Sequence, residues 1–256
     1  MTEEQSRAQK PTSPNDADPS VPDRVLVIQA HPDDAEFSCA GTIAKWTAAG
    51  SEVHYLSITS GDKGSDDATM TGVDLANLRE REQRAACDVL GVASVTFLGY
   101  QDAMVIADLN LRRELVRVMR RIRPTALVCF DPTSRYMGRE YINHPDHVAA
   151  GEASLAAVFP SVRDRMTFPE LLQEGLEPHK VPDVYMFGTT QPDLWVDISG
   201  TIETKVAALK AHASQIGDWD PTEMMYQWAR EAARSHKARP VGFGEYAEAF
   251  KYMRLD

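Results

Sequence analysis

The chain has 256 residues, of which 43% are hydrophobic and 25% are charged, and its formal net charge is −11. This length and apolar content predict a sizeable hydrophobic core. The negative charge and the lack of a basic run argue against a nucleic-acid-binding surface, and no apolar run reaches the ~18 residues that a membrane span needs.

The beginning of the chain is polar and lacks the basic and apolar parts of a secretory signal. We therefore expect residues 1–22 to form a disordered polar tail and residues 23–256 to form one domain. The three cysteines, Cys39, Cys87 and Cys129, lie too far apart to resemble a disulfide framework. Their use is typical of a reducing compartment, so a cytoplasmic location is expected.

Strand and helix signals alternate along the rest of the chain. Strands are predicted at residues 23–30, 52–59, 93–100, 125–130, 183–189 and 193–199. Helices are predicted at residues 36–49, 73–90, 109–122, 147–158 and 202–215, with at least one more helix nearer the C-terminus. This alternation predicts a Rossmann-like, three-layer α/β fold with a mostly parallel sheet and helices on both faces.

Charged residues follow the first predicted strand in the sequence "VLVIQAHPDDAEF". His31, Asp33, Asp34 and Glu36 would lie at the carboxyl end of that strand, where α/β sheets bind ligands. Carboxylates this close together repel one another unless water, a basic side chain or a metal ion lies among them.

A second cluster, "REYINHPDHVAAG", follows the fourth predicted strand. His144 and His147 are spaced to share one face of a helix, and the tripeptide "HPD" occurs here as it does at residues 31–33. Two histidines and one carboxylate form a frequent catalytic zinc ligand set. The alternatives are structural: Asp33, Asp34 or His144 could cap a helix, and His147 could bond to the backbone.

The chain resembles the LmbE-like (PIG-L) family of zinc-dependent N-deacetylases. The resemblance lies in "AHPDDAEFSCAGTIA", "TSGDKGS", "LREREQRAACDVLG", "VTFLGYQD", "NHPDHVAAG", "KVAALKAHASQ" and "EYAEAF". It implies that His31, Asp34 and His147 bind Zn2+. It also implies that Asp33 is the general base and His144 the general acid or electrophile.

The resemblance further implies that Arg79 and Asp102 bind sugar hydroxyls, although Arg79 could instead pair with Glu82 along its helix. One position departs from the family. Some relatives carry a tyrosine two residues before the first histidine of the second motif. Here Ile142 takes that place, and Tyr141 is one residue off.

The resemblance implies a hydrolase that removes an acetyl or other acyl group from the nitrogen of a small amino sugar or its conjugate. One alternative is an amidase that acts on thiol conjugates of the mycothiol type. Another is a non-catalytic carbohydrate-binding protein on the same scaffold. A dinucleotide-dependent oxidoreductase is disfavoured, because no glycine-rich turn follows the first strand. The expected partner is a small amino-sugar-type molecule, and a homo-oligomer is compatible with the sequence.

Overall fold

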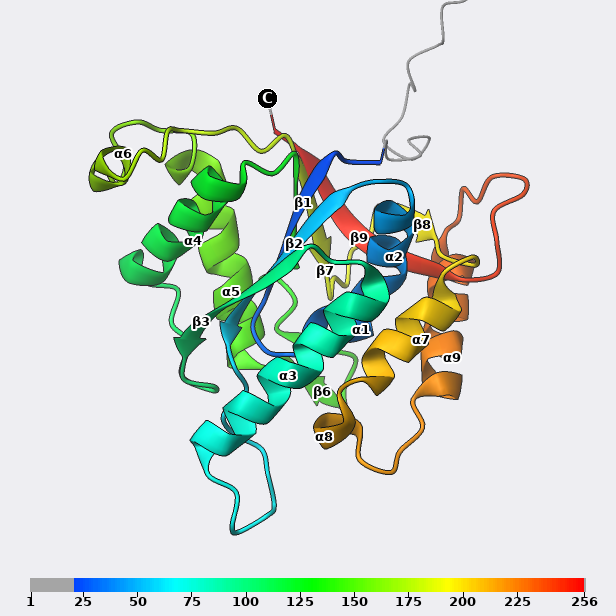
Figure 1. Cartoon of the computed structure of the whole chain (residues 1–256). Coiled ribbons are helices and arrows are strands. Elements are labelled where there is room, and N and C mark those ends of the chain that lie inside the picture. The colour runs from blue at the N-terminus through cyan, green and yellow to red at the C-terminus, as the bar shows by residue number, and fades with distance from the viewer. Residues whose placement is uncertain (1–20, 256) are drawn as a thin grey trace, which may run out of the picture.

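The computed structural model describes residues 21–255, and a seven-stranded sheet in the order β3-β2-β1-β4-β7-β9-β8 lies at its centre (Figure 1). The strands are β1 (Arg24–Gln29), β2 (Glu52–Thr59), β3 (Ser94–Tyr100), β4 (Ala126–Phe130), β5 (Tyr136–Met137), β6 (Tyr141–Ile142), β7 (Asp183–Phe187), β8 (Leu194–Asp197) and β9 (Ala247–Arg254). The helices are α1 (Asp34–Ser38), α2 (Ala40–Ala48), α3 (Gly72–Leu90), α4 (Leu109–Ile122), α5 (Pro145–Ala156), η2 (Ala157–Ser161), α6 (Glu170–Gln173), α7 (Ile202–Lys210), α8 (Ala213–Ile216) and α9 (Thr222–Ser235). Apart from its last two residues, the expected tail at 1–22 lies outside the described residues.

The central strand β1 is buried from Val25 to Gln29 and pairs in parallel with β2 on one side and β4 on the other. Its short aliphatic run suits a strand that helices cover on both faces. The chain adds β2 and β3 on one side of β1 and then returns to place β4 on the other. The strand order therefore reverses between β1 and β4, which is where open α/β sheets bind ligands.

Helices cover both faces of the sheet. On one face α4 packs against α5, and on the other α2 and α3 pack against α7 (Figure 1). The predicted α/β class, with a mostly parallel sheet between two helical layers, is confirmed. Within residues 21–255, no helix is both long and apolar enough to cross a bilayer.

The elements differ from the sequence prediction in several places, and the short elements β5, β6 and α6 were not predicted. The helix expected at 36–49 is two helices, because Cys39 between α1 and α2 has a non-helical backbone (φ −137°). The helix expected at 202–215 is likewise divided into α7 and α8. Strand β9 was not predicted, and it lies antiparallel between β7 and β8. Its alanine, glutamate, lysine and methionine residues favour a helix, and pairing on both edges overrides that preference.

Candidate active site

The first motif forms a turn between β1 and α1 that fixes the carboxylate of Asp34. Its Oδ2 accepts hydrogen bonds from the backbone N–H groups of Ala30 (3.0 Å) and His31 (2.7 Å). The other oxygen, Oδ1, lies 3.0 Å from Nε2 of His147. The backbone therefore orients this buried carboxylate toward the second motif.

The second motif begins helix α5 and sets the directions of two rings. His144 occupies the N-cap position, and its Nδ1 accepts the backbone N–H of Asp146 at 3.2 Å. His147 lies one turn further on, with its Nδ1 2.9 Å from Oδ1 of Asn143 and its ring stacked on Phe130 at 4.2 Å between centroids. His144 therefore caps helix α5, which is one of the structural alternatives considered for it. The ring of His147 contacts side chains rather than backbone.

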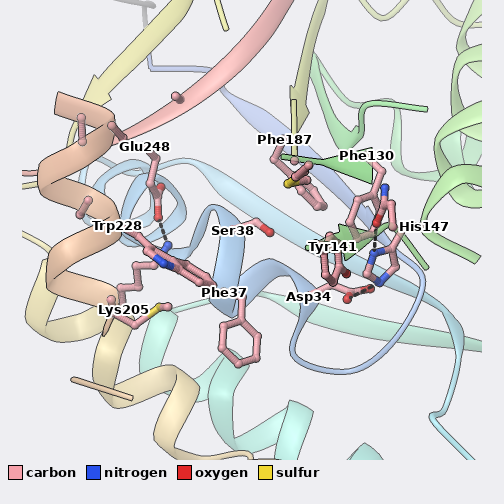
Figure 2. Close-up of a pocket in the computed structure, with 18 residues that line it drawn as sticks. Asp34, Phe37, Ser38, Phe130, Tyr141, His147, Phe187, Lys205, Trp228 and Glu248 are labelled. Carbon is pink, nitrogen blue, oxygen red and sulfur yellow. Dashed lines mark hydrogen bonds and ion pairs between the residues drawn. The ribbon is translucent and has the colours of Figure 1, made fainter. Parts of the chain in front are cut away.

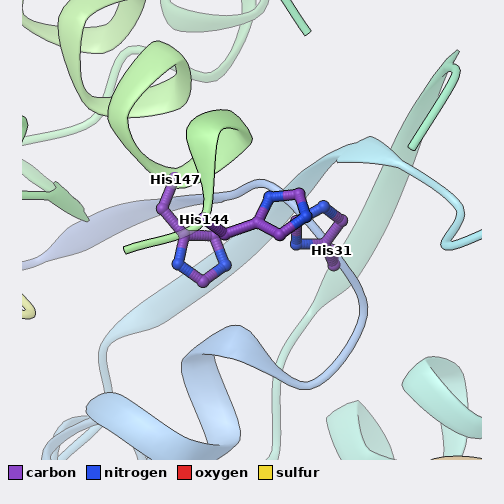
Figure 3. Close-up of side chains that lie close together, drawn as sticks. All are labelled: His31, His144 and His147. Carbon is purple, nitrogen blue, oxygen red and sulfur yellow. The ribbon is translucent and has the colours of Figure 1, made fainter. Parts of the chain in front are cut away.

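The two motifs converge where the strand order reverses (Figures 2 and 3). The rings of His31, His144 and His147 lie 4.6–5.3 Å apart between centroids. Asp34 lies between two of them, 3.0 Å from Nε2 of His147 and 3.6 Å from Nδ1 of His31. In a tetrahedral zinc site with bonds of about 2.0–2.1 Å, neighbouring ligand atoms are about 3.3 Å apart. The two nitrogen–oxygen distances, each to a different oxygen of Asp34, are close to that spacing.

His31 presents one ring nitrogen to this site because the other faces two carboxylates. Its Nε2 lies 3.1 Å from Oδ2 of Asp146 and 3.1 Å from Oδ1 of Asp102. Asp146 is fully buried and also accepts two backbone N–H groups from the loop after β3. A carboxylate on one ring nitrogen fixes the tautomer and makes the other a better ligand. Nδ1, on the opposite side of the ring, therefore faces Asp34 at 3.6 Å.

The same reasoning assigns different hydrogen-bonding states to the rings of His147 and His144. Nδ1 of His147 faces the amide oxygen of Asn143 and acts as a donor, which leaves Nε2 as a lone-pair ligand. Nδ1 of His144 is an acceptor, so Nε2 carries the proton of the neutral ring. Burial and the charge of His31 lower the pKa of His144, which keeps the ring neutral. Among the described residues, two groups of side chains could hold a metal ion: His31, His144 and His147, and His31, Asp102, His144 and Asp146. Neither group contains Asp34, but both include His144, whose N–H suits a hydrogen-bond donor better than a metal ligand.

The charges of the site favour a bound cation. Burial lowers the pKa of His31, but hydrogen bonds to Asp102 and two further carboxylates outweigh burial and raise the pKa to about 12. Burial raises the pKa of Asp33 well above its ordinary value, and the charges of Asp34 and Glu36 act in the same direction. A proton or a metal ion at this place relieves the repulsion between the carboxylates.

Asp33 has a left-handed backbone (φ 96°), which is rare for a residue other than glycine. Its N–H donates to Oε1 of Gln83 at 3.1 Å. Gln83 in turn donates to Glu36, whose carboxylate lies 3.3 Å from the fully buried ring of His212. The side chain of Asp33 forms no capping bond with α1. A buried polar network thus holds a strained turn, and the capping interpretation of Asp33 is wrong.

Arg79, predicted to bind substrate, holds a neighbouring loop. Its Nη1 donates to the carbonyl oxygens of Gly61 (2.8 Å) and Lys63 (2.9 Å). Glu82 accepts instead from the backbone N–H (2.7 Å) and hydroxyl (2.6 Å) of Ser214. The pair considered between Arg79 and Glu82 is not formed, and a sugar contact of Arg79 stays a prediction.

Several side chains orient the histidine rings, and the sequence pointed to few of them. Asp102, predicted to bind sugar, contacts His31, and its sugar contact stays a prediction. Asn143, Asp146 and Phe130 were not predicted. The second HPD tripeptide was the available signal for Asp146, whereas nothing in the apolar run that ends at Phe130 indicates stacking on a histidine.

Tyr141 lies in the site although its place in the sequence is offset by one residue. It lines a pocket together with Asp34 and His147 (Figure 2). Ile142, at the position where some relatives have tyrosine, is 85% exposed. The short β5–β6 hairpin therefore directs residue 141 to the pocket.

Comparisons with known proteins agree with this geometry. The family described as GlcNAc-PI de-N-acetylase (PIG-L) matches residues 26–158. Diacetylchitobiose deacetylase of Thermococcus kodakarensis is 34% identical over 203 residues, which cover 77% of this chain and 74% of that protein. The 1D-myo-inositol 2-acetamido-2-deoxy-alpha-D-glucopyranoside deacetylase of Rhodococcus erythropolis is 30% identical over 247 residues, with coverages of 75% and 81%. The structure of N,N'-diacetylchitobiose deacetylase from Pyrococcus horikoshii with its inhibitor MPG aligns with a TM-score of 0.81 at 29% identity, and covers 91% of this chain and 84% of that chain.

Proposed function

Because the chain belongs to the PIG-L (LmbE-like) family, we propose that it is a metal-dependent hydrolase that removes an acyl group from the nitrogen of a small amino sugar or its conjugate. The observation that carries this function is the convergence of two HPD motifs at the reversal of strand order. The scissile bond would be a linear amide, as in the N-acetyl sugars that the names of the relatives describe.

We propose zinc as the metal, with His31, Asp34 and His147 as its protein ligands. Two nitrogen donors and one oxygen donor, with a position left open, are typical of catalytic zinc. Zinc bound there supplies activation of water and polarisation of the amide carbonyl. Each proposed ligand already has a partner that sets its direction: the β1 turn for Asp34, carboxylates for His31, and Asn143 for His147.

Asp33 and His144 would move the protons. Asp33 directly precedes the proposed ligand Asp34 in the sequence. Its raised pKa suits a base that accepts a proton from the attacking water. The N–H of His144 would stabilise negative charge on the carbonyl oxygen and then supply a proton to the leaving nitrogen. The water oxygen forms the new C–O bond, the C–N bond breaks, and a carboxylate and a free amine leave.

A substrate panel tests this function. It contains N-acetylglucosamine, diacetylchitobiose, a GlcNAc-inositol, a mycothiol-type thiol conjugate and N-acetylbutylamine, with free amine measured by fluorescamine. The acetylated sugars should release amine at least about tenfold faster than the alkylamide, because remote binding energy raises kcat/KM. Release from the thiol conjugate alone would assign the amidase alternative. Sugar binding without amine release would assign a non-catalytic carbohydrate-binding protein.

A further inference from the structure

A large apolar pocket opens beside the proposed metal ligands. Its volume is about 660 Å³, within the range of about 300–1,000 Å³ that small-molecule sites occupy. Asp34, His147 and Tyr141 lie at one end, and Trp228 and the Lys205–Glu248 pair lie at the other (Figure 2). An acetyl group at the metal would fill only a small part of this space.

The wall of the pocket is built from small and apolar side chains on two elements. Helix α9 lines it with Met225, Trp228, Ala229 and Ala232, whose spacing places them on one face of the helix. Strand β9 adds two more alanines to the lining. The small residues leave open the space that larger side chains would fill, and Trp228, at 49% exposure, remains accessible beside it.

The two charged residues of the wall compensate each other. Nζ of Lys205 lies 2.6 Å from Oε1 of Glu248, and both side chains are at most 5% exposed. The carboxylate also accepts the backbone N–H groups of Gly41 (3.0 Å) and Thr42 (2.7 Å) at the start of α2. The pair therefore adds no net charge to the pocket, and an apolar ligand is favoured there.

The order of the sheet separates this pocket from the polar side of the site. The loops after β2 and β3 carry Asp62, Lys63 and Asp102 on one side of β1, and Asp62 accepts the backbone N–H of Asp102 at 2.7 Å. The pocket lies on the other side, over the ends of β4 and β7 and beside β9, with Phe130 and Phe187 in its lining. An amide held between them would direct its hydroxylated sugar to the polar loops and its acyl group to the pocket.

We infer that this pocket receives the hydrocarbon chain of the substrate's acyl group, and that the preferred substrates are amino sugars with an N-acyl chain longer than acetyl. This inference rests on the proposed function and narrows its substrate class. The reaction is unchanged: water adds to the acyl carbon, the C–N bond breaks, and a fatty carboxylate and the amino sugar are released.

A chain-length series tests the inference, using glucosamine N-acylated with acetyl, butanoyl, hexanoyl and octanoyl groups. The value of kcat/KM should rise about threefold for each methylene that the pocket buries, and by at least tenfold between acetyl and octanoyl. An acetyl compound that is hydrolysed as well as or better than the octanoyl compound would overturn the inference and leave the proposed function standing. No amine release from any member would instead contradict the proposed function.

Two substitutions on α9 test whether the preference for long acyl chains arises in this pocket. Ala232→Phe adds a ring inside the pocket, and the ratio of kcat/KM for octanoyl to acetyl substrate should fall at least tenfold. Arg234→Phe adds the same ring at an exposed position outside the lining, and the ratio should keep its wild-type value. Equal ratios in both variants would show that the chain does not lie in this pocket.

A last arm compares octyl and methyl glycosides of N-acetylglucosamine. Little or no gain from the octyl glycoside is expected, because the sugar side of the site is polar. A gain confined to the octyl glycoside, with no gain along the acyl series, would assign the pocket to the aglycone and overturn the inference.

Discussion

Asp33 and Asp146 occupy the same place in the two HPD tripeptides but have different surroundings. The left-handed backbone at Asp33 leaves its carboxylate without a helix-capping bond. Asp146 lies inside the first turn of α5, and its carboxylate is taken up by His31 and two backbone N–H groups. The same tripeptide thus contains the proposed base in one motif and a hydrogen-bond partner of the proposed ligand His31 in the other.

Asp33→Asn tests the assignment of the base. The amide keeps the shape and hydrogen-bonding backbone of the turn but cannot accept a proton from water. Metal content and thermal unfolding should stay as in the wild type, while kcat falls by at least ~10²-fold. Turnover near the wild-type rate in metal-loaded Asp33→Asn protein would show that another group is the base.

His147→Ala tests the ligand set. Removing this ring leaves Asp34 and His31 as the only two proposed protein ligands, and the variant should lose its metal during gel filtration. Elemental analysis compares it with His54→Ala, which removes a histidine that bonds to Ser94 on the edge strand β3, away from the site. Equal zinc content in the two variants would exclude His147 from the metal site.

Asp102→Asn distinguishes a residue that orients His31 from one that binds only sugar. Loss of the carboxylate on Nε2 of His31 should weaken zinc binding by about 10- to 100-fold, measured by competition with a chelator. If Asp102 contacts only the sugar, zinc affinity will stay at the wild-type value. In that case KM will rise for acetylated sugars but not for an acetylated alkylamine.

At the scale of elements, the buried Lys205–Glu248 pair joins α7, β9 and the start of α2. Glu248→Ala removes the hydrogen-bond acceptor for two N–H groups of α2 and leaves the ammonium of Lys205 buried without its partner. We expect a loss of about 3–5 kcal/mol in the free energy of unfolding, measured with urea.

The matched control is Glu177→Ala, which breaks the pair with Arg165, where both side chains are more than 60% exposed. Exposed pairs contribute little, so this variant should unfold close to the wild-type urea midpoint. Equal shifts of the midpoint in both variants would contradict the role given to the buried pair.

Elements with clear apolar periods and terminators were predictable from the sequence. Strand β2 and helix α4 have the predicted bounds, and α3 ends before Gly91, whose left-handed backbone (φ 72°) closes it. The break at Cys39 was not predictable from its neighbours, because residues 36–49 carry no proline and only one internal glycine. The β9 strand depends on pairing with distant strands, which local propensity does not report.

At the scale of the whole molecule, the sheet order places the site. The sequence indicated that both motifs follow strands, but only the order β3-β2-β1-β4 shows that β1 and β4 are neighbours. It also brings Asp102 from the end of β3 past β2 to His31, a contact with no local signal in the sequence. The proposed ligands could therefore be predicted from the family resemblance, whereas the residues that orient them could be identified only from the three-dimensional fold.

The central claim is that a metal held by the two HPD motifs is required for amide hydrolysis, and removal and return of the metal tests it most directly. Acetate and amine release from N-acetylglucosamine are measured for protein as purified, after dialysis against a chelator, and after one equivalent of zinc is restored. The account predicts equal amounts of the two products, loss of both on chelation, and recovery with zinc in the wild type but not in Asp33→Asn. Unchanged release by the fully chelated protein would contradict the account.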